Sequence, residues 1–148
     1  MKKLILILTL AVLLVMPIRA MAVESATATM YKAGPWVIVS IVWVSHTDGT
    51  VSYTFSDLIM AEIRGKTAYM AETDPGATAP TAYNIVINSE NATDIFGGAL
   101  SARSATVSEQ VPPIIGGAYG DRPIVKSLQM EIDTAGDTKG GTLVVFFR

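Results

Sequence analysis

The chain has 148 residues, of which 11 are basic and 13 are acidic, and it contains no cysteine. The lack of cysteine excludes disulfide bonds and thiol catalysis, and the small number of Lys and Arg residues argues against a nucleic-acid partner. A chain of this length can form one domain with a core of its own.

The first 22 residues have the anatomy of a secretory signal peptide. Two lysines precede an apolar run from Leu4 to Met16, and the small residues Ala20 and Ala22 mark a cleavage site. The alternative is a membrane anchor, but this run of 13 residues, one of which is Thr9, is shorter than the roughly 20 apolar residues that span a bilayer. We therefore expect an exported protein, periplasmic or extracellular, that meets the membrane only transiently. Cleavage leaves residues 23–148 as a single domain with 8 basic and 13 acidic residues, a net charge of about −5.

The first part of this domain reads as strands joined by turns. Ala28–Lys32 is a short strand candidate. Trp36–Ser45 is dense in β-branched and aromatic residues, which predicts a strand buried on both faces. Asp48-Gly49 is a strong hairpin signal, so Val51–Phe55 is predicted to return beside Trp36–Ser45.

The segment Ser56–Gly65 is ambiguous, because its residues suit two structures. Ser56 could cap a short helix that Gly65 ends, and the apolar spacing is nearly helical. A strand fits the segment as well, and the sequence leaves both interpretations open. After it, Lys66–Glu72 predicts a strand and Asp74-Pro75-Gly76 predicts a turn.

Alternation returns in Tyr83–Asn88, which places Tyr83 and its two isoleucines on one face and the asparagines on the other. Thr93–Phe96 is predicted to be a short return strand. The next segment, Ala99–Tyr119, is polar and rich in Pro and Gly, which predicts a long surface loop with one strand around Ala105–Glu109. Loops of this length are usually functional or mobile.

The C-terminal part alternates cleanly in Leu128–Asp133, turns over 134–141 and closes with Thr142–Phe147. This closing strand is apolar on both faces, so it lies either in the middle of a sheet or against another subunit. On this ground we expect a homo-oligomer. The seven or eight short strands predict an all-β fold, an antiparallel β-sandwich of jelly-roll or immunoglobulin-like type.

Four stretches carry a resemblance to a known group: T-D-P-G-A-T-A-P-T-A-Y-N-I-V-I, D-I-F-G-G-A-L, S-E-Q-V-P-P and G-D-T-K-G-G-T-L-V-V-F-F. Over roughly Ile63 to Arg148 the chain resembles small virion-associated structural proteins of tailed phages and prophages. The resemblance implies a β-sandwich with a structural role, and it brings no catalytic residues. A signal peptide is not part of that pattern.

Few residues are suited to catalysis or metal binding. A Ser-His-Asp triad would have to use His46, the only histidine, which stands next to the Asp48-Gly49 turn. We therefore predict no catalytic residues and no enzyme. Calcium needs only oxygen ligands, and two loops offer them: one holds Asn88, Glu90, Asn91 and Asp94, and the other holds Asp133 and Asp137. We expect no cofactor, and Asp94, Asp133 and Asp137 are the weak candidates for a calcium site.

Aromatic side chains could bind a ligand. The tyrosines considered are Tyr53, Tyr69, Tyr83 and Tyr119. Tyr119 is the candidate binding residue because it lies in the irregular loop, whereas Trp36 and Trp43 are assigned to the core. The favoured function is a non-enzymatic, exported structural or interaction module that associates with itself or with a protein partner. The alternative is a carbohydrate- or calcium-dependent binding module of the bacterial envelope.

Overall fold

The computed structural model describes residues 23–148, and the predicted signal peptide, residues 1–22, lies outside the described residues. The prediction of an all-β chain is confirmed. The elements are β1 (Ser25–Ala33), β2 (Trp36–Val44), β3 (Val51–Thr54), α2 (Asp57–Ile63), β4 (Ala68–Pro75), β5 (Asn84–Ser89), β6 (Glu109–Val111), β7 (Ile114–Ile115), β8 (Ala118–Tyr119), β9 (Leu128–Asp133) and β10 (Gly140–Phe147). The structure has more strands than the seven or eight expected, and the additional ones are among the very short strands β6, β7 and β8.

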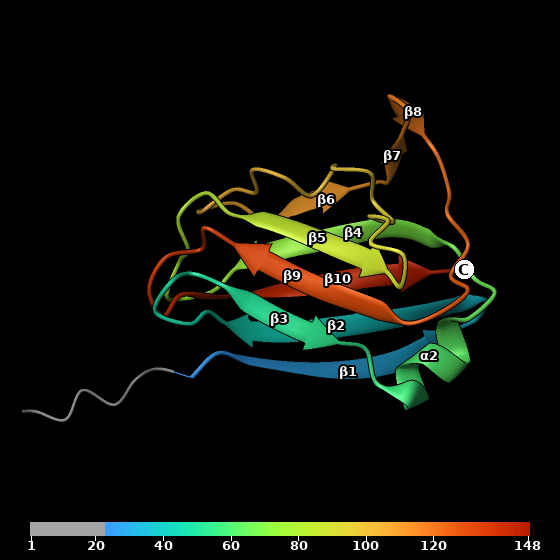
Figure 1. Cartoon of the computed structure of the whole chain (residues 1–148), viewed down its shortest axis with the longest axis horizontal. Helices are drawn as coiled ribbons and strands as arrows, with labels where there is room; N and C mark the ends of the chain where they lie inside the picture. The colour runs from blue at the N-terminus through green and yellow to red at the C-terminus, as the bar shows by residue number, and fades with distance from the viewer. Residues whose placement is uncertain (1–22) are drawn as a thin grey trace, which may run out of the picture.

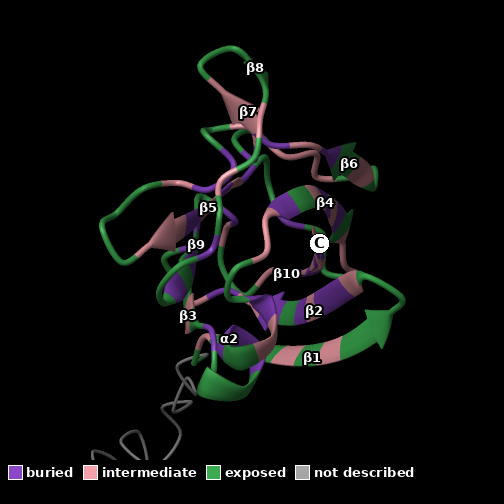
Figure 2. Ribbon diagram, turned by 90° about the vertical axis from the view of Figure 1, so that its right-hand side faces the viewer, coloured by how far each residue is buried: buried purple, intermediate pink, exposed green. Residues whose placement is uncertain are grey.

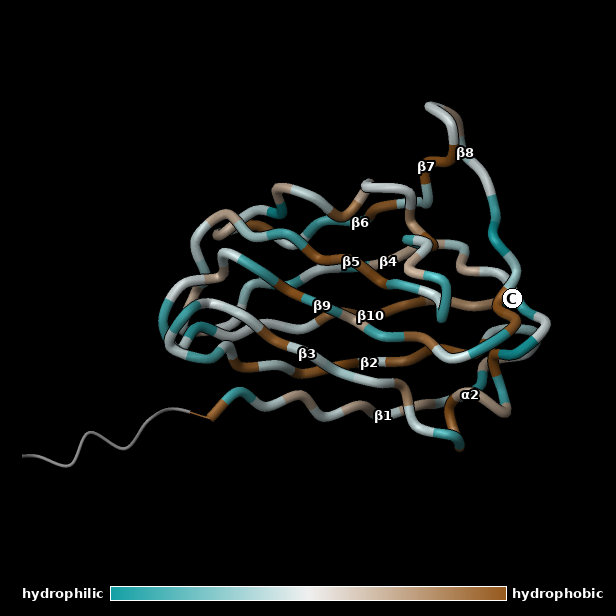
Figure 3. The backbone as a smooth tube through the Cα atoms, viewed as in Figure 1, coloured by the Kyte–Doolittle hydropathy of each residue, from teal (hydrophilic) through white to brown (hydrophobic). Residues whose placement is uncertain are grey.

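The strands form antiparallel sheets. Five of them are joined in the order β1-β2-β10-β4-β6, three in the order β3-β9-β5, and β7 pairs with β8. The three-stranded sheet lies over the middle of the five-stranded sheet, and the β7–β8 hairpin projects from the body (Figure 1). The most apolar strands, β2 and β10, are neighbours in the five-stranded sheet (Figure 3).

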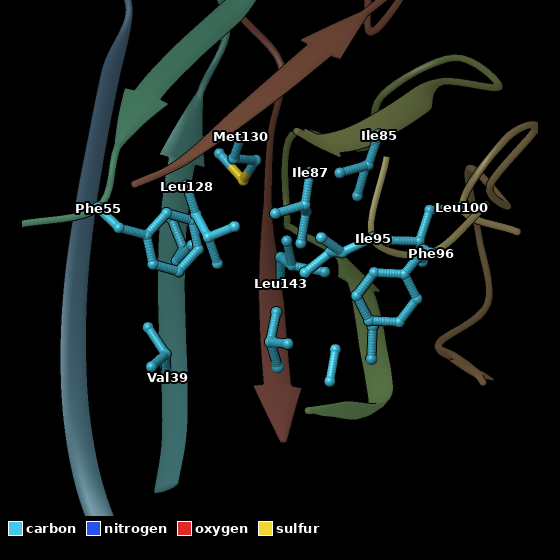
Figure 4. Packing of buried hydrophobic residues seen from close by; sticks show 14 of the residues in the cluster. Val39, Phe55, Ile85, Ile87, Ile95, Phe96, Leu100, Leu128, Met130 and Leu143 are labelled. Atoms are coloured by element: carbon cyan, nitrogen blue, oxygen red, sulfur yellow. The ribbon is translucent and has the colours of Figure 1, made fainter. Parts of the chain in front are cut away.

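The core lies between these two sheets. Leu143 and Val39 from the five-stranded sheet lie across from Ile87 and Met130 of the other sheet (Figure 4), and all four are fully buried. Trp43 belongs to the same cluster, and an added Cβ at Gly141 would lie 2.8 Å from its ring. Only glycine at this position therefore lets the indole pack against β10.

The closing strand is central, which decides between the two interpretations of its apolar character. In β10, Val145 pairs with Val39 of β2 on one side and with Ala71 of β4 on the other. Its inward side chains Leu143, Val145 and Phe147 are fully buried. Because one chain accounts for this apolar strand, the strand itself gives no reason to expect a second subunit.

The predicted hairpin between Trp36–Ser45 and Val51–Phe55 is wrong. The Asp48-Gly49 turn forms, but β3 pairs with β9, and both edges of β2 are taken by β1 and β10. The end of β2 is fixed instead by Ser45, whose hydroxyl donates to the Gly136 carbonyl at 2.7 Å. The hairpin partner of β2 is β1, through the two-residue loop Gly34-Pro35, where Gly34 has the positive φ of +59° that its place in such a loop favours.

The ambiguous segment is a helix. Ser56 caps α2, and its hydroxyl accepts a hydrogen bond from the Ile59 amide at 3.5 Å. Ile59, Met60 and Ile63 are buried, and this tertiary packing outweighs the strand propensity of the isoleucines.

Three further predictions differ from the structure: one, the strand Thr93–Phe96, is wrong, and the other two are displaced along the chain. Asp74 and Pro75 belong to the end of β4, and the turn begins only at Gly76. Thr93–Phe96 is not a strand: a single bridge joins Asn88 to Asp94, and the Asp94 carboxylate then turns the chain by accepting from the Phe96 amide. The strand expected around Ala105–Glu109 begins where that segment ends, as β6.

The central place of β10 predicts a large loss of stability when its core side chain is shortened. We expect Leu143→Ala to lower the free energy of unfolding by about 2–5 kcal/mol, because it leaves a cavity between the sheets. Leu58→Ala is the matched control, since Leu58 is 80% exposed on α2, and we expect it to change stability by about 0.5 kcal/mol or less. Urea unfolding of both variants measures this, and equal losses would contradict the central packing of β10.

Candidate functional site

An open groove of about 760 Å³, which we name the Tyr119 groove, is lined by residues of β4 and β8. Its lining includes Tyr69, Met70, Pro112, Pro113, Tyr119 and Arg148. Gly120 and the polar residues Gln110 and Asp121 complete the lining. The candidate binding residue Tyr119 therefore lines this groove.

The groove exists because the edge of the five-stranded sheet is interrupted. β6 pairs with β4 only over Ala71–Thr73, and Pro112-Pro113 follow directly. Proline cannot donate to a ladder, so the chain leaves the sheet, makes the β7–β8 hairpin, and returns where Pro123 bridges to Thr67. The part of β4 between these two points faces the groove through Tyr69 and Met70.

A β-bulge turns Tyr69 into the groove. The register of β10 against β4 passes from Met70 opposite Phe146 to Ala68 opposite Phe147, so Tyr69 is the extra residue. Regular alternation would point Tyr69 inward, together with Ala71. The bulge instead buries Ala68 completely and leaves Tyr69 41% exposed, which is the way bulges redirect side chains near binding sites.

Tyr69 is held in a small aromatic cluster. Its ring lies 5.0 Å from that of Trp36, and the Arg148 guanidinium lies 4.3 Å from the Tyr69 ring centre. The Asp121 carboxylate is 3.9 Å from Arg148. The assignment of Trp36 to the core is therefore wrong, because this side chain is half-buried on the outward side of the sheet, whereas Trp43 is in the core as predicted.

Tyr119 forms the opposite side of the groove. It ends β8, is 81% exposed, and pairs with Ile114 of β7. The Ile114 amide donates to the Phe96 carbonyl at 3.0 Å, which anchors the base of the hairpin to the body. The two tyrosines thus come from separate parts of the chain, and Pro112, Pro113, Asp121 and Arg148 line the groove with them.

His46 is placed for turn formation. Its Nδ1 lies 3.3 Å from the Thr47 hydroxyl and 3.4 Å from the Asp48 carboxylate. Asp48 accepts from the Thr50 hydroxyl at 2.6 Å, and this hydrogen bond lowers the pKa of that carboxyl. No serine hydroxyl within residues 23–148 forms a hydrogen bond with His46, so the geometry of a triad is not assembled there.

Each of the three acidic candidates already accepts a hydrogen bond from another residue of the chain. Asp94 accepts from the Phe96 amide, Asp137 accepts from Thr138, and Asp133 accepts from Asn84 at 2.7 Å. Across the described part of the chain, no three acidic or histidine side chains come together as a metal site would require. The structure does not bring Asp94, Asp133 and Asp137 together.

A second, smaller hollow of about 310 Å³ lies beside the turn after β5. It is lined by polar residues, among them Asn88, Glu90 and Glu131. Glu90 pairs with Lys126 at 2.9 Å, and Glu131 accepts from Asn88 at 3.5 Å. With its carboxylates engaged in this way, this hollow is a weaker candidate than the Tyr119 groove.

Tyr83 is excluded as a ligand contact, because it is fully buried with its ring 5.3 Å from that of Trp43. Its hydroxyl lies beside the Thr73 hydroxyl, but neither group makes a hydrogen bond of normal geometry, and the Trp43 indole N–H also lacks a partner. Burial raises the pKa of Tyr83 above its usual value, and the neighbouring Thr73 opposes that rise. Tyr53 is half-buried, with its ring 5.6 Å from that of Phe55.

The raised pKa of Tyr83 predicts a stability that falls at alkaline pH. The folded protein keeps the phenolic proton to higher pH than the unfolded chain does, so the contribution is present below the usual pKa of 10.0 and is lost as pH rises through the folded value. We expect Tyr83→Phe to weaken this loss of unfolding free energy above about pH 10.

Urea unfolding at a series of pH values measures the difference between wild type and Tyr83→Phe. Tyr119→Phe, at an exposed position, is the control and should follow the wild type. Parallel curves for wild type and Tyr83→Phe would show that Tyr83 does not titrate as proposed.

Sequence reasoning selected Tyr119 but missed most of the groove. Asp121 and Arg148 carried no pattern that marked them, while V-P-P-I-I-G-G-A-Y-G did show that the chain would leave the sheet. No protein-family model and no curated protein matches the chain. The described residues contain no helix with the length and apolar character of a membrane span.

Proposed function

We propose that the chain is an exported, non-enzymatic interaction module of β-sandwich type that binds a protein segment in the Tyr119 groove. The single observation that carries this proposal is the groove itself, where an exposed tyrosine faces an aromatic cluster beside an interrupted sheet edge. The two sheets that enclose one core support the sandwich class.

The composition of the groove supports a protein ligand. Tyrosine, arginine and methionine are the residue types enriched at protein interfaces, and Tyr and Arg dominate binding hot spots. Tyr69, Tyr119, Met70 and Arg148 supply all three types within one groove. The two prolines add a rigid apolar wall that needs no hydrogen-bond partner for its backbone nitrogen.

A carbohydrate ligand is the second candidate, and one observation favours it. Gln110 and Asp121 place an amide and a carboxylate in the same groove as the exposed Tyr119. An apolar ring beside a few polar groups is also the chemistry that a sugar requires. A binding experiment that compares peptides with oligosaccharides distinguishes the two candidate ligands.

Truncation of Tyr119 should weaken binding. We expect wild-type protein to bind members of a synthetic peptide array, and Tyr119→Ala to weaken that binding by about tenfold or more, as at interface hot spots. Leu58→Ala, an exposed apolar residue on α2, is the control and should bind as wild type does. Tyr119-dependent binding to an oligosaccharide array would favour the second candidate. Binding that Tyr119→Ala leaves intact on both arrays would contradict the proposed site.

The proposed export and the virion-like setting make different predictions for the N-terminus. The resemblance to virion-associated proteins supports a structural role, and such proteins normally assemble in the cytoplasm. Export predicts that mass spectrometry of the protein from the producing cell finds an N-terminus at Val23. An intact Met1 terminus in protein recovered from phage particles would support the virion setting and contradict export.

A further inference from the structure

The two edges of the five-stranded sheet are built differently. At one edge, β6 pairs with β4 over only three residues, and Pro112 and Pro113 follow it directly. A short strand and a proline both keep an edge from pairing with another chain. At the other edge, β1 runs for nine residues without proline, and its register against β2 continues from Ser25 to Ala33 without a bulge. The edge of β1 therefore lacks the features that protect the edge of β6.

β1 is paired on one side only. Its neighbour in the sheet is β2, and no described strand lies beyond it in either view of the molecule (Figure 1 and Figure 2). Its side chains alternate, with Thr27 and Thr29 exposed on the outward side and Ala26, Ala28 and Met30 packed against the core. Within residues 23–148, the outer edge of β1 is thus left without a partner strand.

The hydrogen bonds of β2 show which backbone groups of β1 face this edge. The Ser45 amide, directly after β2, donates to the Lys139 carbonyl at 2.7 Å, so the odd-numbered residues of β2 direct their backbone groups toward β10. Alternation in an antiparallel ladder then directs the even-numbered residues toward β1, where each meets an odd-numbered partner, as Ser40 meets Thr29. The even-numbered residues of β1 therefore direct their N–H and C=O groups to the unpaired edge.

We propose that β1 pairs with β1 of a second copy of this chain, antiparallel, about a two-fold axis at Ala28. Two charged residues select this register. Glu24 and Lys32 each stand four residues from Ala28, on opposite sides of it. About this axis, Glu24 of each copy lies opposite Lys32 of the other, and a symmetric contact repeats this pair of opposite charges.

Other positions of the axis lose these ion pairs. An axis moved by one residue, to Thr29, would place Lys32 opposite the uncharged Ala26. The axis at Ala28 also places Thr27 opposite Thr29, and pairs of threonines across two strands are favourable. Charge and side-chain pairing thus agree on one register.

Lys32 can contact both its own chain and the second copy. Its ammonium lies 2.6 Å from the Glu62 carboxylate of α2, and the Lys32 side chain remains 55% exposed. An ammonium has three N–H donors, so the contact with Glu62 leaves donors for Glu24 of the second copy. Within residues 23–148, Glu24 forms no ion pair of its own. Each copy therefore offers one carboxylate and one ammonium to the other.

The pairing joins the two five-stranded sheets into one continuous sheet through main-chain hydrogen bonds, as in β-augmentation. It leaves the Tyr119 groove open, because none of the residues that line the groove belongs to β1. We therefore expect Tyr119→Ala to leave the mass in solution unchanged. Failure of ligand binding and failure of dimer formation are thus distinguishable.

Sedimentation equilibrium of protein expressed from the full chain, up to roughly 100 µM, tests the dimer. We expect twice the monomer mass for wild type, and a dissociation constant raised roughly tenfold or more in Glu24→Lys and in Lys32→Glu, because each variant sets like charges opposite each other. An equimolar mixture of the two variants should dimerise as the wild type does, since every facing pair then has opposite charges. The matched controls are Glu90→Lys and Lys126→Glu, which change the same charges in an exposed ion pair outside β1 and should remain dimeric.

A monomeric wild type would overturn the proposal. So would charge variants of β1 that remain dimeric, or a mixture that stays as dissociated as its components. Should circular dichroism show that a charge variant is unfolded, single cysteines decide the register, since the chain contains no other. Oxidation should join Ala28→Cys into a covalent dimer, because residue 28 meets its counterpart at the axis, and should leave Ser25→Cys monomeric. Equal yields from the two, or none from Ala28→Cys, would contradict the pairing.

Discussion

The structure depends on the insertion of the last strand between two strands that lie far earlier in the chain. β10 pairs with both β2 and β4, so without it the five-stranded sheet would separate into the pairs β1-β2 and β4-β6. Its inward side chains then supply the surface on which the three-stranded sheet packs. Because Val39 pairs with Val145, this contact closes a very long loop, and contacts of such sequence separation form slowly. A growing chain that lacks residues 140–147 cannot complete its core.

Periodic segments of the sequence were predictable, and the connections between them were not. β9 and β5 follow from strict alternation, because a residue that points inward must be apolar when one face is buried. The sequence left the structure of the α2 segment undecided, because Ser56 favours a helix as its N-cap whereas the isoleucines favour a strand. Asp48-Gly49 did specify a turn, but turn chemistry is local. Whether the chain after a turn stays in its sheet depends on whether the neighbouring edge is free, and β1 and β10 had taken both edges of β2.

The candidate site was less predictable than the fold because it has no contiguous sequence. Tyr119 stood out through the prolines and glycines around it, which mark a departure from regular structure. Its counterpart Tyr69 sits in a strand and looks like any half-buried aromatic residue. What brings it outward is a register shift against Phe146 and Phe147, about 80 residues later in the chain. Sequence patterns within a window of a few residues cannot contain that information.

The bulge at Tyr69 also has an evolutionary consequence. On either side of it, Ala68 and Met70 already satisfy the inward and outward rows of β4. Loss of the single codon for Tyr69 would therefore restore regular alternation and keep the core residues in place, while the aromatic floor of the groove disappeared. Gain of one codon would have created it on a plain strand. The groove at this edge can thus arise or vanish by a change in chain length alone, while the core residues of β4 keep their places.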